Sequence, residues 1–235
     1  MDSYLPVNES NDSSYKELLW DIAKGLQEVD GLYTSHYLDV VAAENIKNNL
    51  TYEQVTEKLQ SYYGSQPVTK ESLKQKEADI VASKIIEFLD THNHTNGIPG
   101  LLGIHEFLFS DVLGELDAGR IRKNNIFKKE AILNGDTVTY GDSSSLRIAL
   151  EILFEKEKKY EYSYPLTEKD VIHLSEFTSE LWSIHPFAEG NTRTTAVFLI
   201  KYLRKFGYDV TNDIFAKNSW YFRNSLVRAN YTNIA

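Results

Sequence analysis

The chain has 235 residues, of which 42% are hydrophobic and 25% are charged, and these ordinary globular proportions exclude a disordered chain. Its 25 Lys and Arg against 34 Asp and Glu give a formal net charge of −9, which excludes a general nucleic-acid binder with a basic surface. The absence of cysteine excludes disulfide bonds, thiolate metal sites and cysteine nucleophiles. The polar amino terminus shows no targeting signal, and no apolar run reaches the roughly 20 residues of a membrane span. We therefore expect a cytoplasmic protein with neither nucleic-acid nor membrane partners.

Apolar residues recur at helical spacing through most of the chain, and capping residues mark several helix starts. Ser35 and Thr167 are expected N-caps, and Thr51 begins a capping-box pattern. The expected helices cover residues 18–31, 35–47, 51 onward, 73–89, 104–116, 144–158, 168–184, 193–206 and 216–229. Turn-forming residues after the third of them separate an N-terminal helical appendage, residues 1–67, from a main domain, residues 68–235.

One segment of the chain has the pattern of a β-hairpin. Two short runs, 126–133 and 137–140, flank Asn134-Gly135, a dipeptide that favours positive φ and therefore a tight hairpin turn. No other part of the sequence predicts strands. The expected fold class is mostly α with one hairpin.

The loop between the helices expected at 168–184 and 193–206 gathers residue types that suit phosphate chemistry. Its sequence, from His185 to Arg193, is HPFAEGNTR. The free amides and the dipole at the start of the following helix favour an anion, and Gly190 lets the backbone approach one closely. Arg193 can donate to phosphate oxygens, Glu189 can bind Mg²⁺, and His185 can accept a proton near neutral pH. Taken separately, these residues are usually a helix cap, a turn or a solvated charge, but their order within one loop favours a functional site.

That order resembles the signature of the Fic family (Fic/Doc fold, bacterial type), although the motif is degenerate. The signature runs His, any residue, Phe, any residue, Asp or Glu, Gly, Asn, Gly, Arg, then two residues and a second Arg. The residues that match in register are His185, Phe187, Glu189, Gly190, Asn191 and Arg193. The segment 118–122 is also similar to the one that precedes the family's flap, and the expected hairpin stands where the flap would be. The resemblance covers residues 84–230 and implies a compact Fic-type helical bundle with one β-hairpin flap.

The resemblance implies a protein adenylyltransferase, which transfers AMP from ATP to a Ser, Thr or Tyr hydroxyl of a target protein or of the enzyme itself. It assigns His185 as the base that deprotonates the hydroxyl and Glu189 as the ligand of Mg²⁺. The nucleotide would meet the loop amides and the side chains of Asn191 and Arg193. The residues implied to bind the nucleotide are Gly190, Asn191, Thr192, Arg193, Tyr221 and Asn230, and those implied to position the target on the flap are Ile132, Leu133, Thr137 and Val138.

The sequence departs from the signature at two positions. Thr192 replaces a glycine, and Ala196 replaces the second Arg, which in the family meets the terminal phosphate. Two alternatives therefore stay open, namely phosphocholine or phosphate transfer on the same fold and a catalytically weak binding module. A second resemblance concerns Glu44-Asn45, which matches part of an inhibitory helix that other Fic proteins carry, with Val40 at its hydroxyl position. Glu44 is accordingly either an inhibitory residue or an ordinary solvated glutamate.

Overall fold

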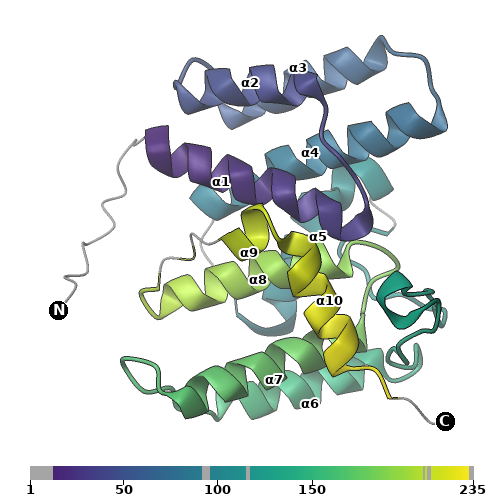
Figure 1. Cartoon of the computed structure of the whole chain (residues 1–235), viewed down its shortest axis with the longest axis vertical. Coiled ribbons are helices and arrows are strands. Elements are labelled where there is room, and N and C mark those ends of the chain that lie inside the picture. The colour runs from purple at the N-terminus through teal and green to yellow at the C-terminus, as the bar shows by residue number, and fades with distance from the viewer. Residues whose placement is uncertain (1–12, 92–95, 115–116, 209, 211–212, 233–235) are drawn as a thin grey trace.

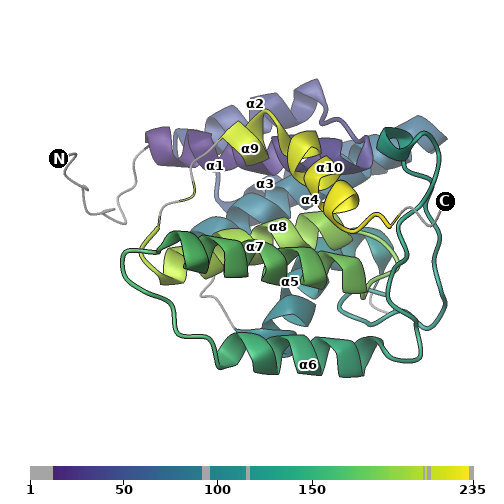
Figure 2. The ribbon, with the colours of Figure 1, turned by 60° about the horizontal axis from the view of Figure 1, so that its bottom comes forward.

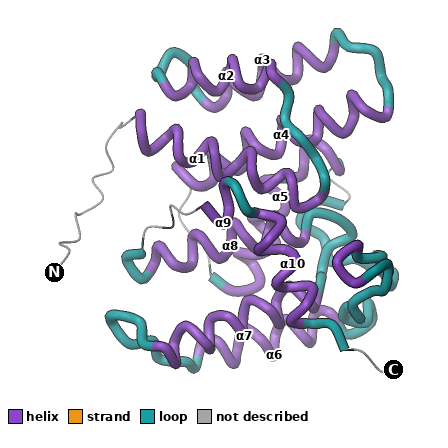
Figure 3. Tube along the Cα trace, viewed as in Figure 1, coloured by secondary structure: helices purple, strands orange, loops and turns teal. Residues whose placement is uncertain are grey.

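The computed structural model describes residues 13–91, 96–114, 117–208, 210 and 213–232. Within these ranges the chain is helical and contains no strand (Figure 3). The helices are α1 (Ser13–Gly25), η1 (Leu26–Asp30, 3₁₀), α2 (His36–Ile46), α3 (Tyr52–Gly64), α4 (Lys70–Thr91), α5 (Gly97–Leu113), η2 (Ala131–Leu133, 3₁₀), α6 (Leu146–Lys158), α7 (Glu168–Ile184), α8 (Asn191–Lys205), α9 (Asp213–Ala216) and α10 (Ser219–Ala229). Among these helices none combines the length and the apolar character needed to cross a membrane.

The predicted caps are confirmed. The Ser35 hydroxyl accepts from the backbone N–H of Leu38, and both Thr51 and Thr167 form complete capping boxes. The fifth helix begins earlier than expected, at Gly97, because Pro99 lies in its first turn, where the missing N–H of proline costs no helical hydrogen bond. Its expected end, Leu116, lies outside the described residues.

The helices are stacked in layers, with α8 near the centre. Figure 1 shows α2 and α3 at one end, α1 and α4 next to them, and α6 and α7 at the other end. Figure 2 shows α5 between α8 and α6, and α5 contacts both. The expected boundary at residue 67 falls between α3 and α4, yet one hydrophobic cluster continues across it, from Leu19 to Phe215. The division into two domains stays a prediction.

The predicted β-hairpin is wrong. The turn itself forms, since Asn134 and Gly135 have φ of 54° and 90°, but a 3₁₀ turn precedes it and the two flanking legs make no ladder. Contacts with distant helices engage the legs instead. The Glu130 carboxylate pairs with Arg223 of α10, and Val138 packs in a small cluster with Trp182 of α7. These side-chain contacts replace the cross-strand pairs that a hairpin needs.

A buried carboxylate holds the N-terminal helices on α4. Asp79 is fully buried and accepts hydrogen bonds from the Ser35 backbone N–H, the Ser35 hydroxyl and the Tyr63 hydroxyl. It therefore links the start of α2 and the end of α3 to α4. Removing it would leave buried donors without an acceptor.

We predict that Asp79→Ala lowers the free energy of unfolding by about 3 kcal/mol or more, since each orphaned buried donor costs about 1–3 kcal/mol. Asp39→Ala is the matched control, because Asp39 pairs with Lys24 at the surface and its side chain is 53% exposed. Asp39→Ala should lower the free energy of unfolding by less than about 1 kcal/mol. Urea denaturation measures both, and equal losses would contradict the role assigned to Asp79.

Candidate active site

The motif loop begins with a sharp reversal at the end of α7. His185 adopts a left-handed conformation, with φ 52° and ψ 59°, which is uncommon for a residue with a side chain. Arg122, itself buried, holds this conformation. Its Nε donates to the His185 carbonyl at 2.8 Å, and its backbone N–H donates to the Pro186 carbonyl at 2.8 Å. Its remaining guanidinium nitrogens donate to the carbonyls of Asn124 and Gly141.

The His185 ring is held as a neutral base. Its Nδ1 lies 3.1 Å from the Trp182 carbonyl, and because a carbonyl only accepts, Nδ1 carries the proton and Nε2 keeps its lone pair. The ring packs against Tyr140 at a centroid distance of 4.0 Å. Burial lowers the pKa of His185 to about 3, with the charges of Lys128 and Arg122 adding to this effect. The imidazole is therefore neutral at pH 7, with its single proton on Nδ1.

Gly190 is required at the start of α8 for two reasons. Its φ of 74° disfavours other residues, and a Cβ built there would lie 2.4 Å from the ring of Phe109. The neighbouring side chain, Asn191, closes the loop on itself, since its amide oxygen accepts from the Phe187 N–H at 2.9 Å and its Nδ2 donates to the Phe187 carbonyl at 2.8 Å. The first amides of α8 consequently stay available for an anion at the helix start.

A buried histidine on α5, His105, also fixes the loop. His105 Nδ1 accepts from the Gly119 N–H at 2.8 Å, so Nε2 carries the proton and donates to the Glu189 carbonyl at 3.1 Å. Burial lowers the pKa of His105 to about 4, which keeps the ring in this neutral form. Thr192, which replaces a glycine of the signature, accepts from Trp182 Nε1 at 3.0 Å. Its hydroxyl thus binds the end of α7.

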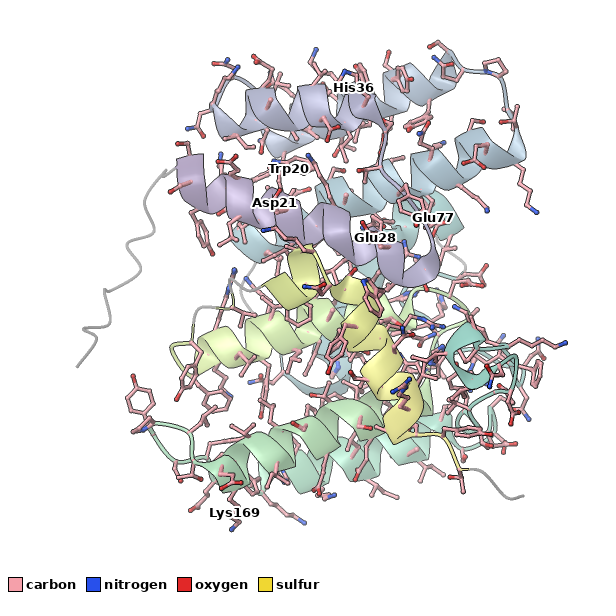
Figure 4. The ribbon with its side chains drawn as sticks, viewed as in Figure 1. Trp20, Asp21, Glu28, His36, Glu77 and Lys169 are labelled. Carbon is pink, nitrogen blue, oxygen red and sulfur yellow. The ribbon has the colours of Figure 1, made fainter. Side chains whose placement is uncertain are left out.

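The Arg193 side chain is sealed inside the protein, with an exposed fraction of 1%. Its Nε lies 2.9 Å from the Asp30 carboxylate, and its terminal nitrogens donate to Gln27 at 3.1 Å and Glu77 at 2.8 Å. Its guanidinium also lies 4.8 Å from the centre of the Phe109 ring. Figure 4 labels Glu77 on α4, close to where η1 passes that helix. η1 and α4 therefore cover Arg193 and bind its terminal nitrogens.

A cavity of about 330 Å³ is lined by residues of the motif loop and of other parts of the chain. His185, Glu189 and the start of α8 line one side. The lining residues from elsewhere in the chain are Asp30, Ile126, Phe127, Lys128 and Arg223. Burial raises the pKa of Glu189, and the charge of Asp30 raises it further. The site thus brings a neutral base, free helix amides and two carboxylates together.

The cavity fits a divalent cation held partly by a ligand. Among the described residues no group of three or more His, Asp or Glu forms a complete protein cage. Mg²⁺ usually needs only one or two carboxylates, with water and substrate phosphates as its other ligands. Glu189, the predicted metal ligand, supplies such a carboxylate in the cavity, whereas Asp30 is paired with Arg193. Burial and the charge of Asp30 both disfavour the charged form of Glu189, and a bound cation would offset that cost.

Several predicted site residues lie elsewhere. Tyr221 is 58% exposed, and Asn230 caps α10 and donates to the Ser179 hydroxyl at 2.8 Å. Ala196 is fully buried in the core. The Glu44 side chain on α2 is 40% exposed and accepts hydrogen bonds from Lys47 and Asn49, so the structure does not bring it to Arg193.

The predicted flap residues are not among those that line the cavity. Val138 is buried in the cluster around Trp182, Ile132 and Leu133 pack against that cluster, and the Thr137 N–H donates to Asp136. The first leg of the same segment, which carries Lys128, faces the cavity instead.

The sequence reasoning missed Asp30, Lys128, Arg122, His105 and Arg223. The segment that contains Arg122 was singled out only as a resemblance. The others carry no local signal, because each acts across a long separation in the chain.

We predict that stability falls as the pH drops from about 6.5 to 4, because the unfolded chain takes up protons at His185 and His105 while the folded chain does not. Each histidine contributes a slope of up to about 1.4 kcal/mol per pH unit. His185→Asn should remove one share of this slope. His36→Asn is the control, since the His36 side chain at the start of α2 is 93% exposed (Figure 4). Urea titrations at several pH values measure the slope, and an unchanged slope in His185→Asn would contradict the buried neutral form.

Comparison with known proteins identifies a family in the central part of the chain. Residues 98–203 match the model of the Fic/DOC family. That range includes α6, α7, the motif loop and nearly all of α8, but not η1 or α4, which cover Arg193. No curated protein matches the chain. The family covers protein AMPylation and related transfer reactions. The chain therefore carries a Fic/DOC family domain over residues 98–203.

Proposed function

We propose that the chain is a Mg²⁺-dependent protein adenylyltransferase that transfers AMP from ATP to a Ser, Thr or Tyr hydroxyl, its own hydroxyls included. The observation that carries this proposal is the position of the His185 base at the same cavity as the first amides of α8. A base and an anion site that line the same cavity suit the attack of a hydroxyl on a phosphate.

In the proposed reaction the target hydroxyl loses its proton to His185 Nε2, which has a free lone pair because Nδ1 is bound to Trp182. The hydroxyl oxygen attacks the α-phosphorus of ATP and forms the new phosphoester bond. The bond from that phosphorus to the bridging oxygen of the β-phosphate breaks, and pyrophosphate leaves with the electron pair. The amides at Gly190 to Arg193 would stabilise the charge on the phosphate oxygens.

Glu189 would hold Mg²⁺, which neutralises phosphate charge when bound. Direct contacts of Asn191 and Arg193 with phosphate oxygens remain part of the proposal, and they require these side chains to exchange their present partners. Binding of the adenosine near Tyr221 and Asn230 and target pairing along the flap segment likewise stay predictions. Inhibition by Glu44 does too, and a change to Gly at that position tests it directly.

The alternatives differ in which part of the donor moves. ATP labelled at the α-phosphate reports AMP transfer, label at the γ-phosphate reports phosphate transfer, and a choline-bearing donor reports phosphocholine transfer. Intact mass measurement of the chain after incubation with Mg²⁺ and ATP detects self-modification. Binding of ATP without any transfer would favour a catalytically weak binding module.

We predict that His185→Ala lowers AMP transfer by about 10²- to 10⁴-fold, the usual effect of losing a general base. The affinity for ATP should change little, because the base acts on the hydroxyl. His36→Ala, a change at an exposed histidine, should leave both quantities unchanged. Undiminished transfer by His185→Ala would rule out the mechanism.

We predict that Glu189→Gln removes the part of ATP affinity that depends on Mg²⁺, since the neutral amide is a poor ligand for a hard cation. Calorimetry with and without Mg²⁺ measures this difference. Glu176→Gln, on the exposed face of α7, is the control. A Mg²⁺ effect of the same size in Glu189→Gln and the wild type would show that Glu189 is not the metal ligand.

A further inference from the structure

The accessible positive charge of the cavity does not come from α8. Arg193 is buried, and position 196 holds an alanine in place of the second Arg of the signature. Neither position supplies a cation to the lining of the cavity. Lys128 and Arg223, which come from other parts of the chain, do line the cavity. A phosphate chain that enters the cavity would meet these two side chains.

The two cations differ in how firmly they are held. Arg223 forms a two-point pair with Glu130, at 2.7 and 2.8 Å, and Glu130 is itself buried. Lys128 has a looser partner, because its ammonium lies 3.6 Å from an Asp30 oxygen and its side chain is 48% exposed. Asp30 is also shared with Arg193, whose Nε is closer, at 2.9 Å. Lys128 is therefore the cation that can change partners at small cost.

The segment that carries Lys128 is fixed on both sides. Before it, Arg122 is bonded to the His185 carbonyl, and after it, Glu130 is bonded to Arg223 and, through its backbone N–H, to the Asp136 carbonyl at 2.8 Å. The ammonium thus extends from an anchored backbone. Its charge acts on three groups of the site, since it helps lower the pKa of Asp30 and of His185 and opposes the rise in the pKa of Glu189.

We infer that Lys128 binds the terminal phosphate of the nucleotide and exchanges Asp30 for a phosphate oxygen as it does so. The inference rests on the proposed function, because it assumes that a nucleotide triphosphate occupies the cavity. Lysine suits the role as a compact charge on a flexible stem. Asp30 then competes with the terminal phosphate for the same ammonium. The missing second Arg of the signature is compensated from the loop rather than from α8.

The test compares the binding of ATP, ADP and inorganic tripolyphosphate to the 235-residue chain by calorimetry in the presence of Mg²⁺. Lys128→Met should lower the affinity for ATP and for tripolyphosphate by about 10- to 100-fold, the effect of losing one charge-assisted contact. It should lower the affinity for ADP by less than about threefold. Lys128→Arg should stay within about threefold of the wild type, since it keeps the charge. Lys129→Met is the matched control, the adjacent exposed lysine of the same segment, and it should change none of the affinities.

A second arm tests the competition with Asp30. Asp30→Asn should raise the affinity for ATP by about 3- to 10-fold, because it removes the carboxylate that pairs with Lys128. Most of this gain should disappear when Lys128→Met is added, since the ammonium that the phosphate gains is then absent. A gain of the same size in both backgrounds would overturn the exchange. Circular dichroism and thermal melting confirm that each variant is folded.

The outcomes separate this inference from the proposed function. Equal weakening of ATP and ADP by Lys128→Met, or no weakening, overturns the role of Lys128 even when the wild type transfers AMP. Selective loss of ATP and tripolyphosphate affinity in a protein that transfers no AMP supports Lys128 and overturns the transfer reaction alone. Failure of ATP and tripolyphosphate to bind the wild type overturns the inference.

Discussion

The guanidinium of Arg193 is a buried charge, and a buried charge has to be paired and hydrogen-bonded for the fold to tolerate it. Its partners come from η1 and α4, so η1 cannot move away without removing Asp30 and Gln27 from this charge. Residue 193 is also in the first turn of α8, which lies at the centre of the bundle. One side chain therefore ties the region before the Fic/DOC match to the loop that carries His185.

Two neutral histidines and one arginine keep that loop in its unusual backbone conformation. Arg122 binds the carbonyls of His185 and Gly141, while His105 binds the carbonyl of Glu189. Because burial keeps both imidazoles neutral, each presents one donor and one acceptor, and each donor is used on a backbone carbonyl. The same burial that gives His185 a free Nε2 also makes the fold sensitive to acid. The free lone pair of His185 and the stability of the fold in acid thus depend on one physical property, the burial of these rings.

The cavity concentrates opposite charges in a chain whose overall charge is −9. Asp30 lies between Arg193 and Lys128, and Glu189 and Arg223 line the same space. The net charge of the protein would repel an anionic ligand, while the helix amides and the cations of this cavity would attract it. Asp30 occupies the position where such a ligand would meet Lys128. The arrangement makes ligand entry a competition between a protein carboxylate and a phosphate.

The sequence by itself determined the helices, the caps at Ser35, Thr51 and Thr167, and the loop with a base and a helix start, because each depends on residues a few positions apart. It predicted a hairpin from the turn at Asn134-Gly135, and the turn is there, but the contacts of its flanking legs with α7 and α10 decided against strands. Only the tertiary structure decided which charges meet. Arg193 and Glu77 are 116 positions apart, and no local pattern in the sequence indicates that they touch. Burial then set the protonation of His185 and sealed Arg193, and burial is a property of the packed chain, since it arises only when distant helices exclude water together.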